Sequence, residues 1–406
     1  MIIFGGTGDL SQKKLLPAMF HLHCDRKLEK FSLVGVGRRQ LTDESYRDMI
    51  KRSLVAMNGT KLSAKAWADF SKNIFYHQGD VTDAGSFDRL CGVIAKLSHR
   101  NKTDNVIYYL AVQPSLTPKI IEKLASKKLC LDKPNAKVVI EKPFGHNQQT
   151  AIQLDQNILS AFQEKQIYRI DHYLGKETVQ NILYFRFGNS IFEPLWNRNY
   201  IDNVQITVAE DIGVEDRGQF YEEACVIRDI VQNHIMQLIA MIAMEAPVSF
   251  KADRLQDEKV KVFRAMRTMH QEYIAENMVV GQYDAGRMNG KKIKAYRQEK
   301  EIASNSKTPT YFAGKFYIDN WRWANVPFYV RVGKRLAKRT TYIAITFKKP
   351  PLKLLGRACD LMHDNTLVFG IQPHEYISLK LNVKNPDEGS HLQPVKMMFD
   401  YNEAFQ

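Results

Sequence analysis

The stretch Ile2-Ile-Phe-Gly-Gly-Thr-Gly-Asp-Leu-Ser11 decides the fold class of this chain. A short apolar run, typical of a buried strand, leads directly into a loop with three glycines. Apolar side chains on one side of the following segment, residues 13–23, predict a helix. A strand, a glycine loop and a helix in this order are typical of a dinucleotide-binding domain, because backbone amides can approach a pyrophosphate at the helix N-terminus. The spacing is GxxGxxS rather than GxGxxG, so the motif alone fits a bare turn equally well.

The first part of the chain continues this pattern. Short apolar runs that end in polar or glycine-containing turns predict further strands at residues 31–36, 106–112 and 137–140. Because these strands alternate with helical stretches, they predict a Rossmann-like, doubly wound parallel sheet, in which ligands bind at the ends of the strands.

The pattern changes near residue 174. Residues 204–208 predict a strand, and residues 221–244 predict one long, mostly apolar helix. Later strands at residues 312–318, 328–332, 342–347 and 376–383 have spacings that suit an antiparallel sheet. The predicted fold class is therefore α/β plus α+β. A dinucleotide-binding domain covers residues 1–174, and a β+α domain with a large, mostly antiparallel sheet covers residues 175–406.

Composition narrows the class of protein. A chain of 406 residues with 44% hydrophobic and 25% charged residues is long enough for two domains and has the balance of a soluble globular protein. No apolar run approaches the ~18 residues that a membrane span needs. The chain begins Met1-Ile-Ile-Phe4 and enters the glycine loop at once, so we expect no signal or transit peptide. The cysteines have no CxxC spacing, which predicts a cytoplasmic protein with reduced thiols and no metal site; they are Cys24, Cys91, Cys130, Cys225 and Cys359.

The net charge of +14 has two interpretations. It is compatible with nucleic-acid binding, but the lysines and arginines are spread along the chain and form no long basic run. A field that attracts anions also suits a phosphorylated substrate and a phosphorylated cofactor, and we favour this second interpretation.

The end of the second predicted strand indicates which cofactor binds. NAD enzymes usually carry an acidic residue there, which holds the ribose hydroxyls. This chain has Gly37-Arg38-Arg39 instead. Two guanidinium groups suit a 2′-phosphate and leave nothing to hold a bare diol, so the sequence predicts NADP. The alternative is a solvated strand end, which explains one arginine more readily than two.

The stretch Arg169-Ile-Asp-His-Tyr-Leu-Gly-Lys-Glu177 is too rich in titratable groups to be an ordinary core segment. In a helix, His172 and Lys176 would share one face at i, i+4, where two cations suit a phosphate, and Asp171 would point elsewhere. A salt-bridged surface turn is the alternative. The basic stretch Phe328-Tyr-Val-Arg-Val-Gly-Lys-Arg-Leu-Ala-Lys-Arg339 likewise fits either an anion site or a surface turn.

His234 lies within the predicted apolar helix, where a histidine is more often a satisfied core residue than a catalyst. Asp171 is a candidate partner for it. An Asp–His pair holds one imidazole tautomer and raises its basicity. The other ring nitrogen can then take a proton from a sugar hydroxyl while hydride leaves the same carbon, and this chemistry needs no metal.

Five motifs, in order along the chain, resemble those of glucose-6-phosphate dehydrogenases. They are Ile3 to Leu10, Glu141-Lys-Pro-Phe-Gly145, residues 169–177, Gln232-Asn-His234, and Asp319-Asn-Trp-Arg-Trp323 with Val326-Pro-Phe-Tyr329. The resemblance implies oxidation of the β-pyranose of glucose 6-phosphate at C1 to the 6-phosphoglucono-lactone, with reduction of NADP, at the entry to the pentose phosphate pathway. It also implies a homodimer or homotetramer assembled through the second domain.

Carried over position by position, the resemblance implies that His234 is the general base and that Asp171 orients it. The implied 6-phosphate site is His172, Tyr173, Lys176 and Arg339. The implied sugar contacts are Glu210, Asp229, Lys334 and Gln372. Lys142 and Pro143 resemble the pair that positions substrate and nicotinamide. The implied cofactor contacts are Gly5, Gly6, Thr7, Gly8, Asp9, Leu10, Lys14, Arg38, Asp80, Val81 and Tyr109.

The chain departs from the family pattern at two places. Cys225-Val226 stands where the family usually has Gly-Ala, and the larger side chains would either crowd the sugar site or need compensating space. Family members also continue for several tens of residues past the position of Gln406, so we expect a C-terminally truncated chain with an incomplete second domain. An inactive, regulatory relative is therefore an alternative. A dehydrogenase of another hexose 6-phosphate is a second one, because contacts to the phosphate say little about which epimer is bound.

Overall fold

The computed structural model describes residues 1–28, 30–58, 62–80, 83–127, 135–145, 147–351, 362–385 and 392–404. It divides into two compact units, Met1–Ile170 and Asp171–Gln406. The division falls between residues 170 and 171, while the change of pattern in the sequence placed it near 174. Within the part of the chain that the structure describes, every helix is too short or too polar to cross a lipid bilayer.

The first unit is built on a six-stranded sheet with the order β3-β2-β1-β4-β5-β6. All neighbouring strands are parallel. This confirms the predicted Rossmann-like sheet, with the reversal of strand order between β1 and β4. The strands are β1 (Ile2–Phe4), β2 (Leu33–Gly37), β3 (Ile74–Gln78), β4 (Val106–Leu110), β5 (Ala136–Ile140) and β6 (Ile167–Arg169).

Helices cover both faces of this sheet, because successive side chains of a strand point to opposite faces. Ile2 and Phe4 belong to one apolar cluster, with side chains of α4, α5 and α6, while Ile3 belongs to another, with side chains of α1, α2 and α3. The helices are η1 (Ser11–Leu15), α1 (Leu16–Cys24), α2 (Asp43–Asn58), α3 (Ala64–Ser71), α4 (Ala84–Asn101), η2 (Pro114–Leu116), α5 (Thr117–Ser126), α6 (Gln148–Leu159) and η3 (Glu164–Gln166).

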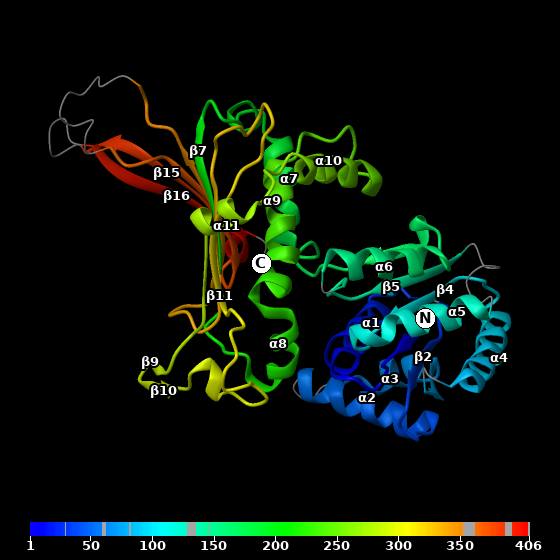
Figure 1. The fold of residues 1–406 in the computed structure, drawn as a ribbon. Coiled ribbons are helices and arrows are strands. Elements are labelled where there is room, and N and C mark those ends of the chain that lie inside the picture. The colour runs from blue at the N-terminus through cyan, green and yellow to red at the C-terminus, as the bar shows by residue number, and fades with distance from the viewer. Residues whose placement is uncertain are drawn as a thin grey trace. The chain divides into compact units, whose positions relative to one another are not determined.

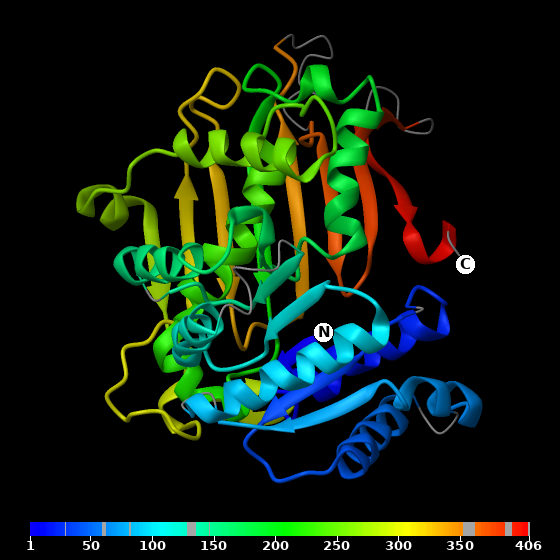
Figure 2. The same ribbon diagram turned by 90° about the vertical axis from the view of Figure 1, so that its right-hand side faces the viewer.

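The second unit is built on an eight-stranded sheet with the order β16-β15-β14-β13-β7-β12-β11-β8. Its strands lie side by side in Figure 2. Neighbours are antiparallel except β7 and β12, which are parallel, so the predicted mostly antiparallel sheet is confirmed. The strands are β7 (Ile201–Ala209), β8 (Met278–Gly281), β11 (Tyr311–Phe316), β12 (Phe328–Gly333), β13 (Thr340–Phe347), β14 (Thr366–Gln372), β15 (Tyr376–Lys384) and β16 (Leu392–Asp400), with a separate hairpin of β9 (Gly286–Met288) and β10 (Lys291–Ile293).

Helices pack along one face of this sheet, as Figure 1 shows for α7, α8 and α9. Alternate residues of β7, namely Val204, Ile206 and Val208, join the apolar cluster that contains Ile235, Leu238 and Ile239. The helices are α7 (Glu177–Gly188), η4 (Glu193–Leu195), η5 (Glu215–Arg217), α8 (Gly218–Val226), η6 (Ile227–Ile235), α9 (Met236–Ala243), α10 (Ala252–Arg264), α11 (Gln271–Asn277), η7 (Tyr296–Gln298) and α12 (Tyr401–Ala404).

Buried donors hold the C-terminal end of α9, where the last carbonyl groups have no partner within the helix. Arg186, which is fully buried, donates to the carbonyl oxygens of Met241 and Met244 at 3.0 Å each. The indoles of Trp196 and Trp323 donate to the next two carbonyls, those of Ile242 and Ala243.

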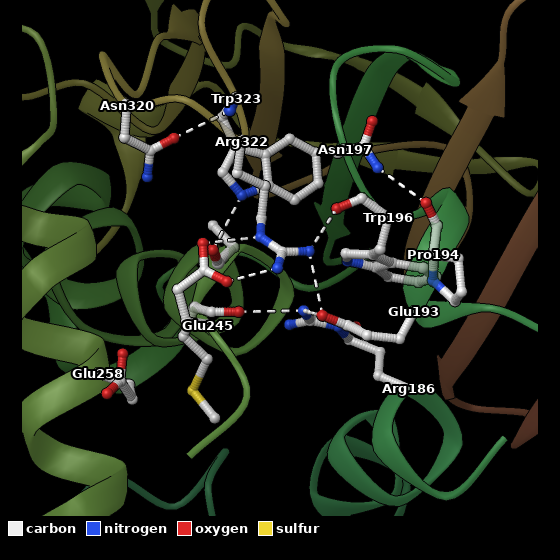
Figure 3. A network of polar contacts seen from close by, with 12 residues as sticks. Arg186, Glu193, Pro194, Trp196, Asn197, Glu245, Glu258, Asn320, Arg322 and Trp323 are labelled. Carbon is white, nitrogen blue, oxygen red and sulfur yellow. Dashed lines mark hydrogen bonds and ion pairs between the residues drawn. The ribbon is translucent and has the colours of Figure 1, made fainter. Parts of the chain in front are cut away.

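Acidic groups complete this network (Figure 3). Arg186 pairs with Glu193 at 3.1 Å, and Arg322 pairs with Glu193 at 3.0 Å and with Glu245. Burial lowers the pKa of Arg186 to about 10, and the carboxylates oppose this. A buried arginine without such partners would be strongly destabilising, so the network fixes the helix that follows His234.

The single helix predicted over residues 221–244 is wrong. The segment forms α8, then the π-helical turns of η6, then α9. At Cys225 the backbone leaves helical geometry, with φ 50° and ψ 176°. Side chains in this region of backbone space clash, and glycine alone adopts it without strain. The apolar pattern continues through the kink because both sides of it face the same core, and therefore periodicity does not reveal it.

Two further expectations need correction. The segment 171–176 forms successive turns rather than a helix: the amides of Leu174, Gly175 and Lys176 donate to the carbonyls three residues before them. The sequence pattern does not predict β3, β6, β8, β14 and β16, nor the hairpin strands β9 and β10. β16 is mostly exposed and contains Pro394, so it shows no strong apolar alternation.

We predict that Cys225→Gly stabilises the protein. Strain of this kind costs ~1–3 kcal/mol, and a glycine adds roughly 0.5–1 kcal/mol of backbone entropy to the unfolded state, so a net gain of about 1 kcal/mol is expected. Urea unfolding measures it. Cys225→Ala is the matched control, because it removes the thiol but keeps the Cβ and hence the strain. Equal stability of wild type and Cys225→Gly would show that the kink carries no strain.

Candidate active site

Four predicted site residues meet at one edge of the large sheet because of its topology. Glu210 follows the last residue of β7 and Lys334 follows the last residue of β12, and these parallel strands pair Ala209 with Gly333. The carboxyl ends of parallel strands lie at the same edge. Lys334 Nζ consequently donates to Glu210 Oε2 at 2.6 Å, and the lysine side chain is 1% exposed. A buried pair of this kind is held in one geometry.

The antiparallel strands next to β7 bring two more residues to the same edge. Arg339 directly precedes β13, and Gln372 ends β14, where it pairs with Thr341. Gln372 donates to Thr341 Oγ1 at 3.0 Å and accepts from Lys176 Nζ at 2.5 Å. Burial lowers the pKa of Lys176, the Glu375 carboxylate opposes this, and the charge of Arg339 lowers it further. Two cations that repel each other favour an anion between them.

Asp171 and His234 lie in contact. Nδ1 of His234 is 2.7 Å from Oδ1 of Asp171, and the same oxygen accepts the backbone N–H of Tyr173 at 2.9 Å. The second bond closes a short turn that fixes the carboxylate. His234, on η6, is 3% exposed. A carboxylate at Nδ1 makes this nitrogen the donor and leaves Nε2 as the acceptor.

Two rings hold the imidazole of His234. The Tyr173 ring stacks on it with centroids 4.0 Å apart, and the His172 ring meets it edge-on at 4.5 Å. Burial raises the pKa of Tyr173 to about 12, so its hydroxyl stays protonated. The stacking fixes the plane of a ring whose Nδ1 is already held by Asp171.

Asp171, His172 and His234 also bring potential metal-ligand atoms within 4.8 Å of one another. Oδ1 of Asp171 and Nδ1 of His234 are already joined by a hydrogen bond. A metal-free reaction stays a prediction.

Asp229 lies on η6, five residues before His234, and Tyr221 lies on the other side of the kink at Cys225. The Tyr221 hydroxyl is buried and has no hydrogen-bond partner among the described residues. Burial and the charges of Asp229 and Glu210 all raise its pKa. Lys334 Nζ lies 5.3 Å from the centre of its ring. The Cys225 side chain is itself 8% exposed, within the same polar cluster.

The glycine loop of the first unit lies at the carboxyl end of β1, where the strand order reverses. Gly5 has φ +82°, and a Cβ there would stand 2.1 Å from the carbonyl oxygen of Ala111. A Cβ on Gly6 would stand 2.6 Å from Cα of Gly35. The loop is closed by Gly8 N–H, which donates to Gly5 O at 2.9 Å. This geometry fits the pyrophosphate of a dinucleotide.

The remaining residues predicted to contact the cofactor surround this loop. Thr7, Asp9 and Leu10 belong to it, and Lys14 is exposed on η1. Arg38 and Arg39 are exposed directly after β2, which fits a 2′-phosphate, and Asp80 follows β3. Val81 lies outside the described residues, as do Cys130 and Cys359.

Tyr109, on β4, donates its hydroxyl to Glu141, directly after β5, at 2.5 Å. Burial, with the adjacent carboxylate, raises the pKa of Tyr109. Lys142 and the cis-linked Pro143 come next in the chain. Glu141 therefore holds the Tyr109 hydroxyl next to Lys142 and Pro143 in the chain, the two residues predicted to position the nicotinamide.

Sequence reasoning missed several supporting residues. Tyr46 is fully buried and donates to the carbonyl oxygen of Gly6 at 3.0 Å, and Thr341 holds Gln372. Glu141 stood within a quoted motif but had no assigned role. Tyr46 and Thr341 occur in ordinary helix and strand patterns, which give no signal of such contacts.

Comparison with known proteins identifies the family. Residues 2–181 match the model of the glucose-6-phosphate dehydrogenase NAD binding domain, and residues 183–406 match that of the C-terminal domain. The chain is 43% identical over 404 residues to glucose-6-phosphate 1-dehydrogenase of Bacillus subtilis, covering 99% of this chain and 82% of the relative. The enzyme of Aggregatibacter actinomycetemcomitans is likewise 43% identical over 404 residues, with 99% and 81% coverage.

Solved structures agree. A glucose-6-phosphate dehydrogenase in complex with glucose 6-phosphate matches with a TM-score of 0.89 and 34% identity, covering 100% of this chain and 82% of that one. The Mycobacterium avium enzyme matches with a TM-score of 0.84 and 34% identity, covering 99% and 84%. This chain belongs to the glucose-6-phosphate dehydrogenase family.

Proposed function

We infer that this chain oxidises β-D-glucose 6-phosphate at C1 to 6-phospho-D-glucono-1,5-lactone and reduces NADP to NADPH, the first step of the oxidative pentose phosphate pathway. The observation that carries this inference is the presence of the Asp171–His234 pair, together with the Glu210–Lys334 pair, in a member of the family. Coupled NADP reduction with glucose 6-phosphate tests it, with other hexose 6-phosphates as competitors. Absence of turnover with glucose 6-phosphate would contradict it.

In the proposed mechanism His234 is the general base. Its Nδ1–H donates to Asp171, so Nε2 is the nitrogen that accepts the proton of the C1 hydroxyl. NADP, when bound, supplies the acceptor for the hydride that leaves C1. The proton and the hydride together remove two electrons and two hydrogens from C1–OH, which becomes the lactone carbonyl. Asp171 stabilises the imidazolium that forms on His234.

The substrate is proposed to be held by two groups of side chains. His172, Tyr173, Lys176 and Arg339 bind the 6-phosphate, which is supported by the mutual repulsion of Lys176 and Arg339. Glu210, Asp229, Lys334 and Gln372 contact the sugar hydroxyls. Carboxylates and an ammonium at fixed positions suit hydroxyls, which both donate and accept hydrogen bonds.

The cofactor is proposed to bind the first unit. Gly5, Gly6 and Gly8 let the backbone approach the pyrophosphate, and Arg38 and Arg39 face the 2′-phosphate. The other proposed contacts are Thr7, Asp9, Leu10, Lys14, Asp80, Val81, Tyr109, Lys142 and Pro143, of which Lys142 also contacts the substrate.

A homodimer or homotetramer through the second unit and a cytoplasmic location are further proposals. The first is supported by exposed apolar side chains on β16, namely Val395, Met397, Met398 and Phe399. Large exposed apolar patches mark interaction surfaces. Sedimentation velocity decides it, and a monomer at micromolar concentration would rule it out.

We predict that His234→Asn lowers kcat ~10²–10⁴-fold, the usual contribution of a positioned base, with a modest change in KM. Asparagine keeps the size of the side chain but cannot take a proton at neutral pH. Initial rates of NADP reduction measure the effect. His270→Asn, on an exposed histidine outside the site, is the control and should be normal. Near-normal turnover of His234→Asn would assign His234 to the core.

We predict that Arg38→Ala raises the KM for NADP about tenfold or more and leaves that for NAD nearly unchanged. One charge-assisted hydrogen bond contributes ~1.5–3 kcal/mol, and NAD has no 2′-phosphate to receive it. Steady-state kinetics with both cofactors measure the ratio. An equal rise for both cofactors would refute a 2′-phosphate contact.

A further inference from the structure

A lysine outside the predicted site is bonded to the helix that follows His234. Lys259 is on α10, which packs against α9, and its side chain is half-buried. Lys259 Nζ donates to Oε1 of Gln237 at 3.0 Å. Gln237 is on α9, three residues after His234, which lies near the end of η6, so the two residues are within about one helical turn of each other. The ammonium is thus anchored to the helical segment that carries His234.

The electrostatic surroundings of Lys259 single out one partner. Burial lowers the pKa of Lys259, and the Asp171 carboxylate opposes this by favouring the ammonium. Two other cations of α10 have acidic partners on their own helix: Lys261 pairs with Glu258 at 2.7 Å, and Arg254 pairs with Asp257 at 3.4 Å. Lys259 instead has a neutral amide as its hydrogen-bond partner, and the charge that favours its ammonium is that of Asp171.

The other titratable groups around the pair are on different elements. His172 and Tyr173, from the turn after Asp171, contact the His234 ring directly. Lys176 and Arg339 belong to the proposed phosphate site. The charge of Arg339 lowers the pKa of both Tyr173 and Lys176. Arg186, from α7, binds the opposite end of α9 and pairs with Glu193. Lys259 is thus a cation of α10 on which the Asp171 charge acts.

We propose that Lys259 is a positioning residue for the base: it anchors Gln237, and its fixed positive charge acts on Asp171. This rests on the proposed function of His234. A carboxylate removed from water is driven towards its neutral form, in which it no longer stabilises an imidazolium. A nearby ammonium keeps it ionised. The same charge also repels the protonated imidazole directly. Because a carboxylate ionises well below the pH at which a histidine does, Asp171 is already ionised there, and the direct repulsion sets the sign: it keeps the base unprotonated at lower pH.

The sign of the expected pH effect follows from this charge. Protonation of the base ends activity on the acid side. Removing a positive charge near the pair makes protonation easier, and the acid limb of kcat/KM moves to higher pH. A unit charge at several ångströms in a partly buried site shifts such a limb by about half a unit to one unit.

The test is the pH profile of three full-length variants. Lys259→Met removes the charge and keeps the length of the side chain, and it should move the acid limb upward by about half a unit or more. Lys259→Arg keeps the charge and should restore the wild-type profile. Lys261→Met is the matched control, two residues along the same helix and exposed, and should leave the profile unchanged.

Two results would overturn the proposal. One is a Lys259→Met profile that coincides with wild type while the thermal midpoint falls, which assigns Lys259 to packing alone. The other is an equal shift in Lys261→Met, which indicates a general charge effect. If Lys259→Met does not fold, Lys259→Gln, which can still donate to Gln237, is measured in its place and has the same expected shift. Failure of the proposed function is read separately, because the wild-type acid limb would then persist in His234→Asn.

Discussion

The parallel pairing of β7 with β12 is the constraint on which the site of the second unit depends. It places Glu210 and Lys334 at one edge of the sheet, and the antiparallel neighbours β13 and β14 bring Arg339 and Gln372 to that edge. Backbone hydrogen bonds along whole strands set this register. Such a register is difficult to alter locally, since a one-residue slip would turn every buried side chain of a strand to the opposite face. The polar groups are therefore held before any substrate arrives.

The helical layer supplies the base and carries the less favourable features of the unit. α9 is fixed at its end by Arg186, Trp196 and Trp323, while the segment before it contains a kink at Cys225 and an unsatisfied hydroxyl at Tyr221. Strain and unpaired buried groups persist where the surrounding structure enforces them. The rigid end of α9 and the sheet edge provide that enforcement.

Much of this could be predicted from the sequence. The short first strand, the glycine loop and several later strands follow from apolar runs and turn residues. The pairing of Asp171 with His234 was predicted because the titratable stretch around Asp171 offers a carboxylate as a candidate partner for this histidine. The kink at Cys225 could not be predicted, because a continuous apolar pattern hides it. Tyr46, Thr341 and Lys259 also gave no signal: each acts through one long-range hydrogen bond in an ordinary element. The turn at residues 171–176 replaced a helix because Asp171 bonds its own backbone two residues on.

The most direct test of the central claim is the tautomer of His234. In protein labelled with ¹⁵N-histidine, the resonances that are lost in His234→Asn assign this side chain, and their chemical shifts show which nitrogen carries the proton. At a pH above the acid limb of the activity profile, we expect the neutral tautomer with the proton on Nδ1 and an unprotonated Nε2. Asp171→Asn should change this pattern. A proton on Nε2 in the wild-type protein would contradict the account, because that nitrogen could not then accept the C1 hydroxyl proton.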